Sequence, residues 1–122
     1  MMGDISAAIS IPDVLHACGV KQVETVDPLD LEAAQAAVKR SVAADGIAAV
    51  IFKSPCIAVT KPATKYVVDT SRCTGCKQCI RELGCPAVVW EGGKAQIDTG
   101  LCYGCTICAQ VCPFGAIGKE RA

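Results

Sequence analysis

The chain has 122 residues, with 12 basic and 12 acidic side chains, so its formal charge at pH 7 is zero. A neutral chain lacks the basic surface that nucleic acid selects, so no nucleic-acid partner is expected. No apolar run reaches the roughly 20 residues of a membrane span, and the N-terminus lacks the features of a signal peptide. We therefore expect a cytoplasmic protein with no membrane contact.

The first 62 residues are predicted to alternate between helix and strand. Four elements are expected, in the order helix, strand, helix, strand: residues 10–20, 21–26, 29–44 and 47–52. Asp27 is predicted to cap the longer helix, whose buried stripe is predicted to be Leu31, Ala34, Val38 and Val42. Because two parallel strands with one helix between them are marginal alone, we interpret this half as an incomplete α/β parallel-sheet segment. It is either the tail of a larger domain or a surface that docks on a partner.

The remaining residues, 63–122, are predicted to form a second, α+β domain. Residues 54–64 contain Pro55 and Pro62 and few helix signals, and we predict that they are a linker. Short strands are expected at residues 65–69, 88–90, 94–98 and 116–117, with short helices at 77–83 and 106–111. Glu91-Gly92-Gly93 is a hairpin turn between the second and third of these strands.

Eight of the ten cysteines lie in this second half, in two near-copies of one pattern. The first copy is Cys73-x2-Cys76-x2-Cys79-x5-Cys85-Pro86, and the second is Cys102-x2-Cys105-x2-Cys108-x3-Cys112-Pro113. Further residues recur with the cysteines at an interval of 29: Lys65, Asp69, Thr70 and Gly75 return as Lys94, Asp98, Thr99 and Gly104. Neither copy can bury its apolar side alone, so we predict a pseudo-twofold repeat with one shared core.

The second spacing is the established one of bacterial two-cluster ferredoxins, in which the fourth cysteine of each run binds the other cluster. On that pattern, cluster 1 takes Cys73, Cys76, Cys79 and Cys112, and cluster 2 takes Cys102, Cys105, Cys108 and Cys85. Gly75 and Gly104 allow positive φ and close approach of the backbone to inorganic sulfide. The prediction is a ferredoxin-like dicluster domain with two 4Fe–4S clusters.

Two other uses of the cysteines fit the sequence less well. A disulfide-rich secreted module is disfavoured because no signal sequence is apparent. A zinc-binding interaction module is disfavoured because zinc sites use separated cysteine pairs, whereas here a third cysteine follows at once in both runs. Cys18 and Cys56 stand outside the runs and are predicted to pack in the core.

Three other kinds of side chain have less specific interpretations. His16, the sole histidine, is interpreted as a solvated or core-edge residue. Trp90 and Tyr103 are expected to shield the clusters from water. Lys77 and Arg81 could attract an acidic redox partner, although such residues more often form a solvated face.

With both halves considered, the chain resembles the C-terminal end of the large (alpha) subunit of indolepyruvate:ferredoxin oxidoreductase. The matching stretches include Val26-Asp27-Pro28, Phe52-Lys53-Ser54-Pro55-Cys56, Arg81-Glu82-Leu83-Gly84-Cys85-Pro86 and the residues from Cys108 to Ile117. The resemblance implies that thiamin diphosphate and coenzyme A convert an arylpyruvate to an aryl-acetyl-CoA in the whole enzyme. It also implies electron transfer through the clusters to an external ferredoxin, and a small partner subunit.

The chain departs from that family by lacking its thiamin diphosphate site. The Gly-Asp-Gly stretch is missing, and the sequence contains no Asn for the metal–diphosphate. Residues 1–62 resemble the tail of the thiamin-diphosphate-binding domain, so we expect an electron-transfer segment that is not catalytic alone. Its partner would be the rest of the large subunit or a separate thiamin-binding chain. The alternative is a stand-alone dicluster electron carrier that docks on another oxidoreductase; a large exposed apolar face on residues 1–60 would favour the first interpretation.

Overall fold

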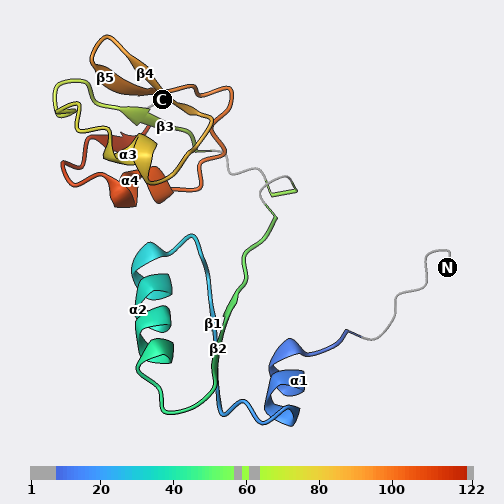
Figure 1. The fold of residues 1–122 in the computed structure, drawn as a ribbon. Coiled ribbons are helices and arrows are strands. Elements are labelled where there is room, and N and C mark those ends of the chain that lie inside the picture. The colour runs from blue at the N-terminus through green and yellow to red at the C-terminus, as the bar shows by residue number, and fades with distance from the viewer. Residues whose placement is uncertain (1–7, 57–58, 61–63, 121–122) are drawn as a thin grey trace, which may run out of the picture. The chain divides into compact units, whose positions relative to one another are not determined.

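A computed structural model describes residues 8–56, 59–60 and 64–120. The chain divides into two compact units, Met1–Lys53 and Ser54–Ala122 (Figure 1). The predicted linker, residues 54–64, is described only in part, and the predicted boundary at residue 62 lies outside the described residues. In the part of the chain that is described, no helix is long and apolar enough to cross a membrane.

The first unit is a two-stranded parallel sheet with two helices. Its elements are α1 (Ile11–Ala17), β1 (Gln22–Val26), α2 (Leu31–Val42) and β2 (Ala48–Phe52). β1 and β2 pair in parallel from Gln22↔Ala48 to Val26↔Phe52, with α2 as the crossover between them. Figure 1 shows the sheet edge-on, with α1 and α2 on opposite sides of it. The predicted order of elements and the incomplete α/β sheet are thereby confirmed.

The helix α2 begins later than predicted. Asp30 is its N-cap, and the carboxylate of Asp30 accepts a hydrogen bond from the Ala33 amide at 3.0 Å. Asp27, the predicted cap, instead accepts a hydrogen bond from the Leu29 amide at 2.8 Å. Because the Asp27 carboxylate stabilises this turn, which contains Pro28, the helix starts only after Asp30. The prediction of Asp27 as N-cap was wrong.

The buried face of α2 also differs from the predicted stripe. Ala34 is 7% exposed and Ala37 is fully buried, whereas Val38 and Val42 are 41% and 81% exposed. Alanine lets the helix backbone lie close to the strands, and two strands are too narrow to cover the valines as well. α1 likewise has no buried residue, because the narrow sheet does not cover it.

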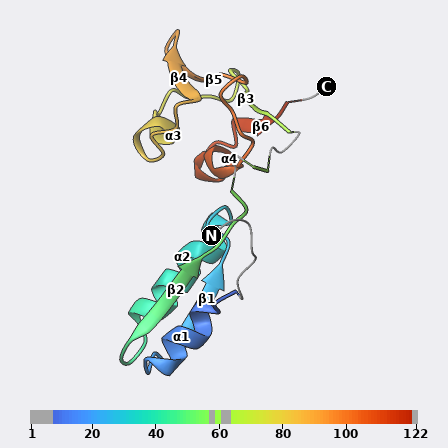
Figure 2. The ribbon, with the colours of Figure 1, turned by 90° about the vertical axis from the view of Figure 1, so that its right-hand side faces the viewer.

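The second unit contains four short strands and two short helices. The elements are β3 (Tyr66–Val68), α3 (Gln78–Arg81), β4 (Val88–Glu91), β5 (Lys94–Ile97), α4 (Ile107–Val111) and β6 (Ile117–Lys119). β3 pairs with β6 and β4 with β5, both antiparallel (Figure 2). The α+β fold predicted for this half is confirmed. Its core is thin: among the described residues, the buried cluster consists of Tyr66, Cys79, Ala87, Val88, Ala95, Cys102 and Ile117.

The two antiparallel pairs are related by the same interval of 29 residues that the sequence shows. Val68 pairs with Ile117 in the first sheet, and the residues 29 positions from each, Ile97 and Val88, pair in the second. The pairing is completed by two matching hydrogen bonds, from Asp69 N to Ala116 O at 2.7 Å and from Asp98 N to Ala87 O at 2.8 Å. The predicted pseudo-twofold repeat is therefore present in the backbone.

The different cysteine spacings of the two copies compensate for one another. Five residues separate Cys79 from Cys85, but three separate Cys108 from Cys112. After the fourth cysteine the difference reverses, because one residue separates Cys85 from Ala87 and three separate Cys112 from Ala116. The strands that follow regain the interval of 29, so the extra residues alter only the approach of each fourth cysteine.

Candidate metal centre

Each cysteine run begins with the same turn at an aspartate. The carbonyl of Asp69 accepts a hydrogen bond from Cys73 N at 3.0 Å, and the carbonyl of Asp98 accepts one from Cys102 N at 2.9 Å. Each carboxylate also accepts the amide two residues later, at 2.9 and 2.8 Å. These hydrogen bonds fix the first cysteine of each run at the end of β3 or β5.

The backbone of each run turns inward at two positions with positive φ. Gly75 and Gly104 have φ of 76° and 73°, and Lys77 and Thr106, two residues later, have φ of 62° and 71°. Lys77 and Thr106 are the non-glycine residues with positive φ among those that the structure describes. A left-handed conformation costs roughly 1–2 kcal/mol for a residue with a side chain. Its recurrence at equivalent positions indicates a loop shaped for a ligand, because alternating backbone turns direct amides into an anion-binding concavity.

This pair of strained residues was not anticipated from the sequence. Lys77 and Thr106 are different residue types, so they do not stand out as a match between the copies. The sequence does show that the two residues occupy equivalent positions, directly after the second cysteine of each run, and this could have indicated a shared conformation.

The eight predicted ligand cysteines lie around two cavities, four around each. The first cavity is lined by Cys73, Cys76, Cys79 and Cys112. The second is lined by Cys85, Cys102, Cys105 and Cys108. Three thiols of each set come from one run and the fourth comes from the other run. That these thiols bind two clusters in the crosswise way stays a prediction.

The electrostatics of the thiols reflect the same grouping. Burial raises the pKa of Cys79, and the neighbouring Cys112, Cys76 and Cys73 raise it further. Burial raises the pKa of Cys108 to about 11, with additional contributions from the other three thiols of its set. Four thiolates gathered in such a space repel one another, so a bound cation is needed to hold them deprotonated.

Hydrogen bonds hold the cysteine loops at both centres. The Gly104 amide donates to Cys102 Sγ at 3.4 Å, and the Ala116 amide donates to Cys112 Sγ at 3.4 Å. Lys65 Nζ donates to the carbonyl of Cys102 at 2.6 Å, so the lysine of the first copy holds the loop of the second. Its equivalent, Lys94, donates in turn to a carbonyl at the start of the first copy's loop. Amides directed at sulfur are a standard means of tuning the reduction potential of a bound cluster.

The residues present fit a 4Fe–4S cluster at each cavity. The donor set is four cysteines, which is the usual ligation of such a cluster, and no histidine or carboxylate lines either cavity. Within the described ranges, no three His, Cys, Asp or Glu side chains are close enough to share a single metal ion. A cubane distributes its four thiolates over four iron atoms, so its ligands do not need to converge on one point. The ten cysteines are all free thiols.

The two aromatic residues, the two remaining cysteines and the histidine all lie at the surface. Trp90 lines the first cavity and Tyr103 the second, while 38% and 47% of their surfaces remain exposed. Cys18 and Cys56 are both exposed, so the prediction that they pack in the core was wrong. Cys18 follows α1 and Cys56 comes after β2, and the two-stranded sheet of the first unit is too small to bury either thiol. His16 is an exposed residue whose Nδ1 lies 2.9 Å from the carbonyl oxygen of Val20, as a core-edge interpretation implies.

Comparison with known proteins identifies one domain and one set of relatives. Residues 95–118, which include the second cysteine run, match the family model of the 4Fe-4S binding domain. The chain is 42% identical over 122 residues to the indolepyruvate oxidoreductase subunit IorA of Methanothermobacter marburgensis, covering 98% of this chain and 20% of that protein. It is 38% identical over 123 residues to the IorA subunit of Pyrococcus horikoshii, covering 93% and 19%.

These matches confirm the resemblance to the C-terminal end of that subunit, and the chain spans about a fifth of the length of these relatives. Among solved structures, ferredoxin I from Desulfovibrio africanus aligns with a TM-score of 0.41 and 23% identity, over 49% of this chain and all of that one.

Proposed function

We propose that this chain, similar over nearly its whole length to the C-terminal end of the IorA subunit, is the electron-transfer segment of an indolepyruvate (arylpyruvate):ferredoxin oxidoreductase. The observation that carries the proposal is the grouping of eight thiols into two sets of four, each shared between the two cysteine runs. When bound, two 4Fe–4S clusters supply one-electron transfer. No residue of the chain is assigned a bond-making role.

The chain's own residues would do three things at these centres. The cysteines hold the clusters: Cys73, Cys76, Cys79 and Cys112 at the first, and Cys102, Cys105, Cys108 and Cys85 at the second. The amides of Gly104 and Ala116 donate hydrogen bonds to sulfur and stabilise its negative charge. Trp90 and Tyr103 cover part of each cavity and limit the access of water.

The first unit supports a role inside a larger enzyme. Large apolar side chains lie open on it: Ile9, Ile11, Val14, Val38, Val42, Ile47 and Phe52 are each between 41% and 81% exposed. Exposed apolar surface on this scale indicates contact with further protein, which favours the segment interpretation over a stand-alone carrier. The proposed partners are the rest of the large subunit or a separate thiamin-binding chain, a small partner subunit and an external ferredoxin. Thiamin diphosphate would be bound in that complex and not by this chain.

The test is metal and sulfide analysis of the chain purified without oxygen. We expect about eight iron and about eight acid-labile sulfide per chain, as two 4Fe–4S clusters require. Zinc without sulfide would instead identify a zinc-binding module and overturn the proposal.

A double-mutant comparison tests the crosswise assignment. Cys76→Ala and Cys112→Ala should each remove one cluster, and the double variant should lose no more, because both residues serve the same cluster. Cys76→Ala combined with Cys85→Ala should remove both clusters, leaving almost no iron. If the pairing Cys76 with Cys112 removed both clusters and the pairing Cys76 with Cys85 removed one, the sharing would be within each run and the assignment would be wrong.

A further inference from the structure

The two cavities of the second unit differ in which of their ligand thiols and charged side chains reach the surface. Cys76, at the first cavity, is the one exposed thiol among the eight; the other seven are buried or half-buried. Thr74, Lys77, Pro113 and Phe114, which also line the first cavity, are exposed as well. At the second cavity Cys102 and Gly104 are buried. The first centre therefore has the one ligand thiol that a partner protein can contact directly at the surface.

Three cations lie beside the first cavity, and we call Arg72, Lys77 and Arg81 the basic rim. The Lys77 ammonium lies over the Trp90 ring, 4.3 Å from its centroid. Arg81 donates to the carbonyl of Cys76 at 3.1 Å. Arg72 donates to the carbonyl of Phe114 at 3.1 Å. All three side chains are thus held at the opening by neutral groups of the cavity wall.

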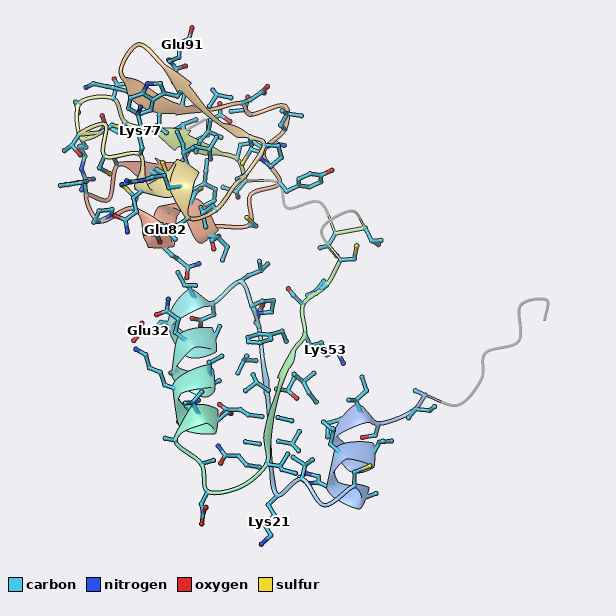
Figure 3. All side chains as sticks on the ribbon, in the orientation of Figure 1. Lys21, Glu32, Lys53, Lys77, Glu82 and Glu91 are labelled. Carbon is cyan, nitrogen blue, oxygen red and sulfur yellow. The ribbon has the colours of Figure 1, made fainter. Side chains whose placement is uncertain are left out.

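The charge of the basic rim is only partly balanced by carboxylates. Asp69, which interacts electrostatically with Arg72, is also occupied by hydrogen bonds from Ser71. Figure 3 shows Glu82 and Glu91 well apart from Lys77. Among the residues that the structure describes, the one ion pair is Arg40–Glu24, in the other unit. An excess of positive charge therefore remains beside the exposed thiol.

The centre of this surface is apolar. Phe114 is 47% exposed and Trp90 is 38% exposed, and both lie within the basic rim. An aromatic centre with a charged margin is the usual composition of a protein–protein interface. The second cavity has exposed apolar residues too, Leu101 and Tyr103, but no charged side chain lines it. One cation, Lys65, donates to the carbonyl of Cys102 in its wall, whereas three cations lie beside the first cavity, so its attraction for an acidic partner is weaker.

From these features we infer that the face formed by the basic rim, Trp90 and Phe114 is the docking site of a small acidic one-electron carrier protein, which receives its electron from the first centre. The inference rests on the proposed function. The same electron that leaves the reduced chain reduces the carrier, so the chain is oxidised and the carrier reduced by one electron each, with no bond formed or broken. Positive charge beside the exposed cysteine draws an acidic carrier to the place where the electron path is shortest, because charge complementarity raises the association rate.

The test uses the whole chain, assembled with its clusters and reduced without oxygen. The rate of electron transfer to an acidic ferredoxin is measured by stopped-flow absorption for the unaltered chain and for Lys77→Glu combined with Arg81→Glu. We expect the variant to react about tenfold more slowly than the unaltered chain at low ionic strength. The difference should largely disappear at an ionic strength of about 0.5 M, because salt screens surface charges. Lys21→Glu in the first unit is the matched control, and it should leave the rate unchanged.

Two further measurements separate the possible failures. An uncharged quinone as electron acceptor should react equally with all three proteins, which shows that the variants still hold reducible clusters. With the unaltered chain, the rate to the acidic ferredoxin should fall with salt, whereas the rate to a basic cytochrome should not. If the chain is reducible but its rate to the acidic ferredoxin ignores both salt and the two substitutions, the docking site is wrong and the proposed function stands. If no reducible cluster forms, the proposed function fails first.

Discussion

The glycine in the first cysteine run provides a sharp test of how the cluster loop packs. Gly75 has φ of 76°, and a Cβ at this position would lie 2.8 Å from the carbonyl oxygen of Gly93 and 3.3 Å from the ring of Trp90. Gly75→Ala therefore combines two costs: about 1–2 kcal/mol for the left-handed conformation and about 1–3 kcal/mol for crowding against a backbone atom. We expect a total loss of roughly 2–5 kcal/mol in the stability of the second unit.

Gly92→Ala is the matched control for this substitution. Gly92 has φ of 57°, and a Cβ there would meet nothing within 4 Å, so only the conformational cost of about 1–2 kcal/mol applies. The assay is anaerobic urea denaturation of the cluster-loaded chain, followed by the visible absorption of the clusters. Gly75→Ala should lose its clusters at clearly lower urea than Gly92→Ala. Equal midpoints would show that the loop does not lie against the β4–β5 turn, and the packing argument would be refuted.

Three other perturbations have defined outcomes. Asp30→Ala should cost the first unit about 1 kcal/mol through loss of the α2 cap, whereas Asp27→Ala should cost less; the reverse order in urea denaturation followed by circular dichroism would restore Asp27 as the cap. Glu24→Gln removes the exposed pair with Arg40 and should change stability by less than about 1 kcal/mol, so a larger loss would contradict its exposed setting. Because the thiol of Cys108 has a pKa raised to about 11 and must lose its proton to bind iron, cluster assembly in the cluster-free chain should be faster at pH 9 than at pH 7; a rate independent of pH would argue against a buried, protonated thiol.

The second unit was predictable from sequence because its ligands constrain the chain. Three cysteines at fixed short spacing must curl around one centre, and the interval of 29 residues shows that the arrangement occurs twice. The strands, the hairpin at Gly92 and Gly93 and the crosswise grouping of thiols all follow from that pattern. The conformation of Lys77 and Thr106 did not, because positive φ at these positions is imposed by closure of the loop and not by residue type.

The first unit was harder to predict in detail because its packing depends on what covers it. Hydrophobic spacing placed Val38 and Val42 in the core, which would hold if a wider sheet lay beneath α2. With two strands available, the helix rests on Ala34 and Ala37, and the valines stay exposed. Cys56, which follows β2, was also expected to be buried and is exposed. Local pattern identifies the elements of this half, but the buried face is decided by neighbouring strands.

The compensated cysteine spacing makes the two metal centres inequivalent. A perfect repeat would give two equivalent centres and no preferred direction for an electron. Here the extra residues lie before Cys85 in one copy and after Cys112 in the other, so the pairing of strands is preserved while the surroundings of the two cavities diverge. The residues after Cys112 include Phe114, whose carbonyl holds Arg72 at the opening of the first cavity. The departure from symmetry thus creates part of the face that distinguishes one centre from the other, and the proposed electron transfer in one direction would use that difference.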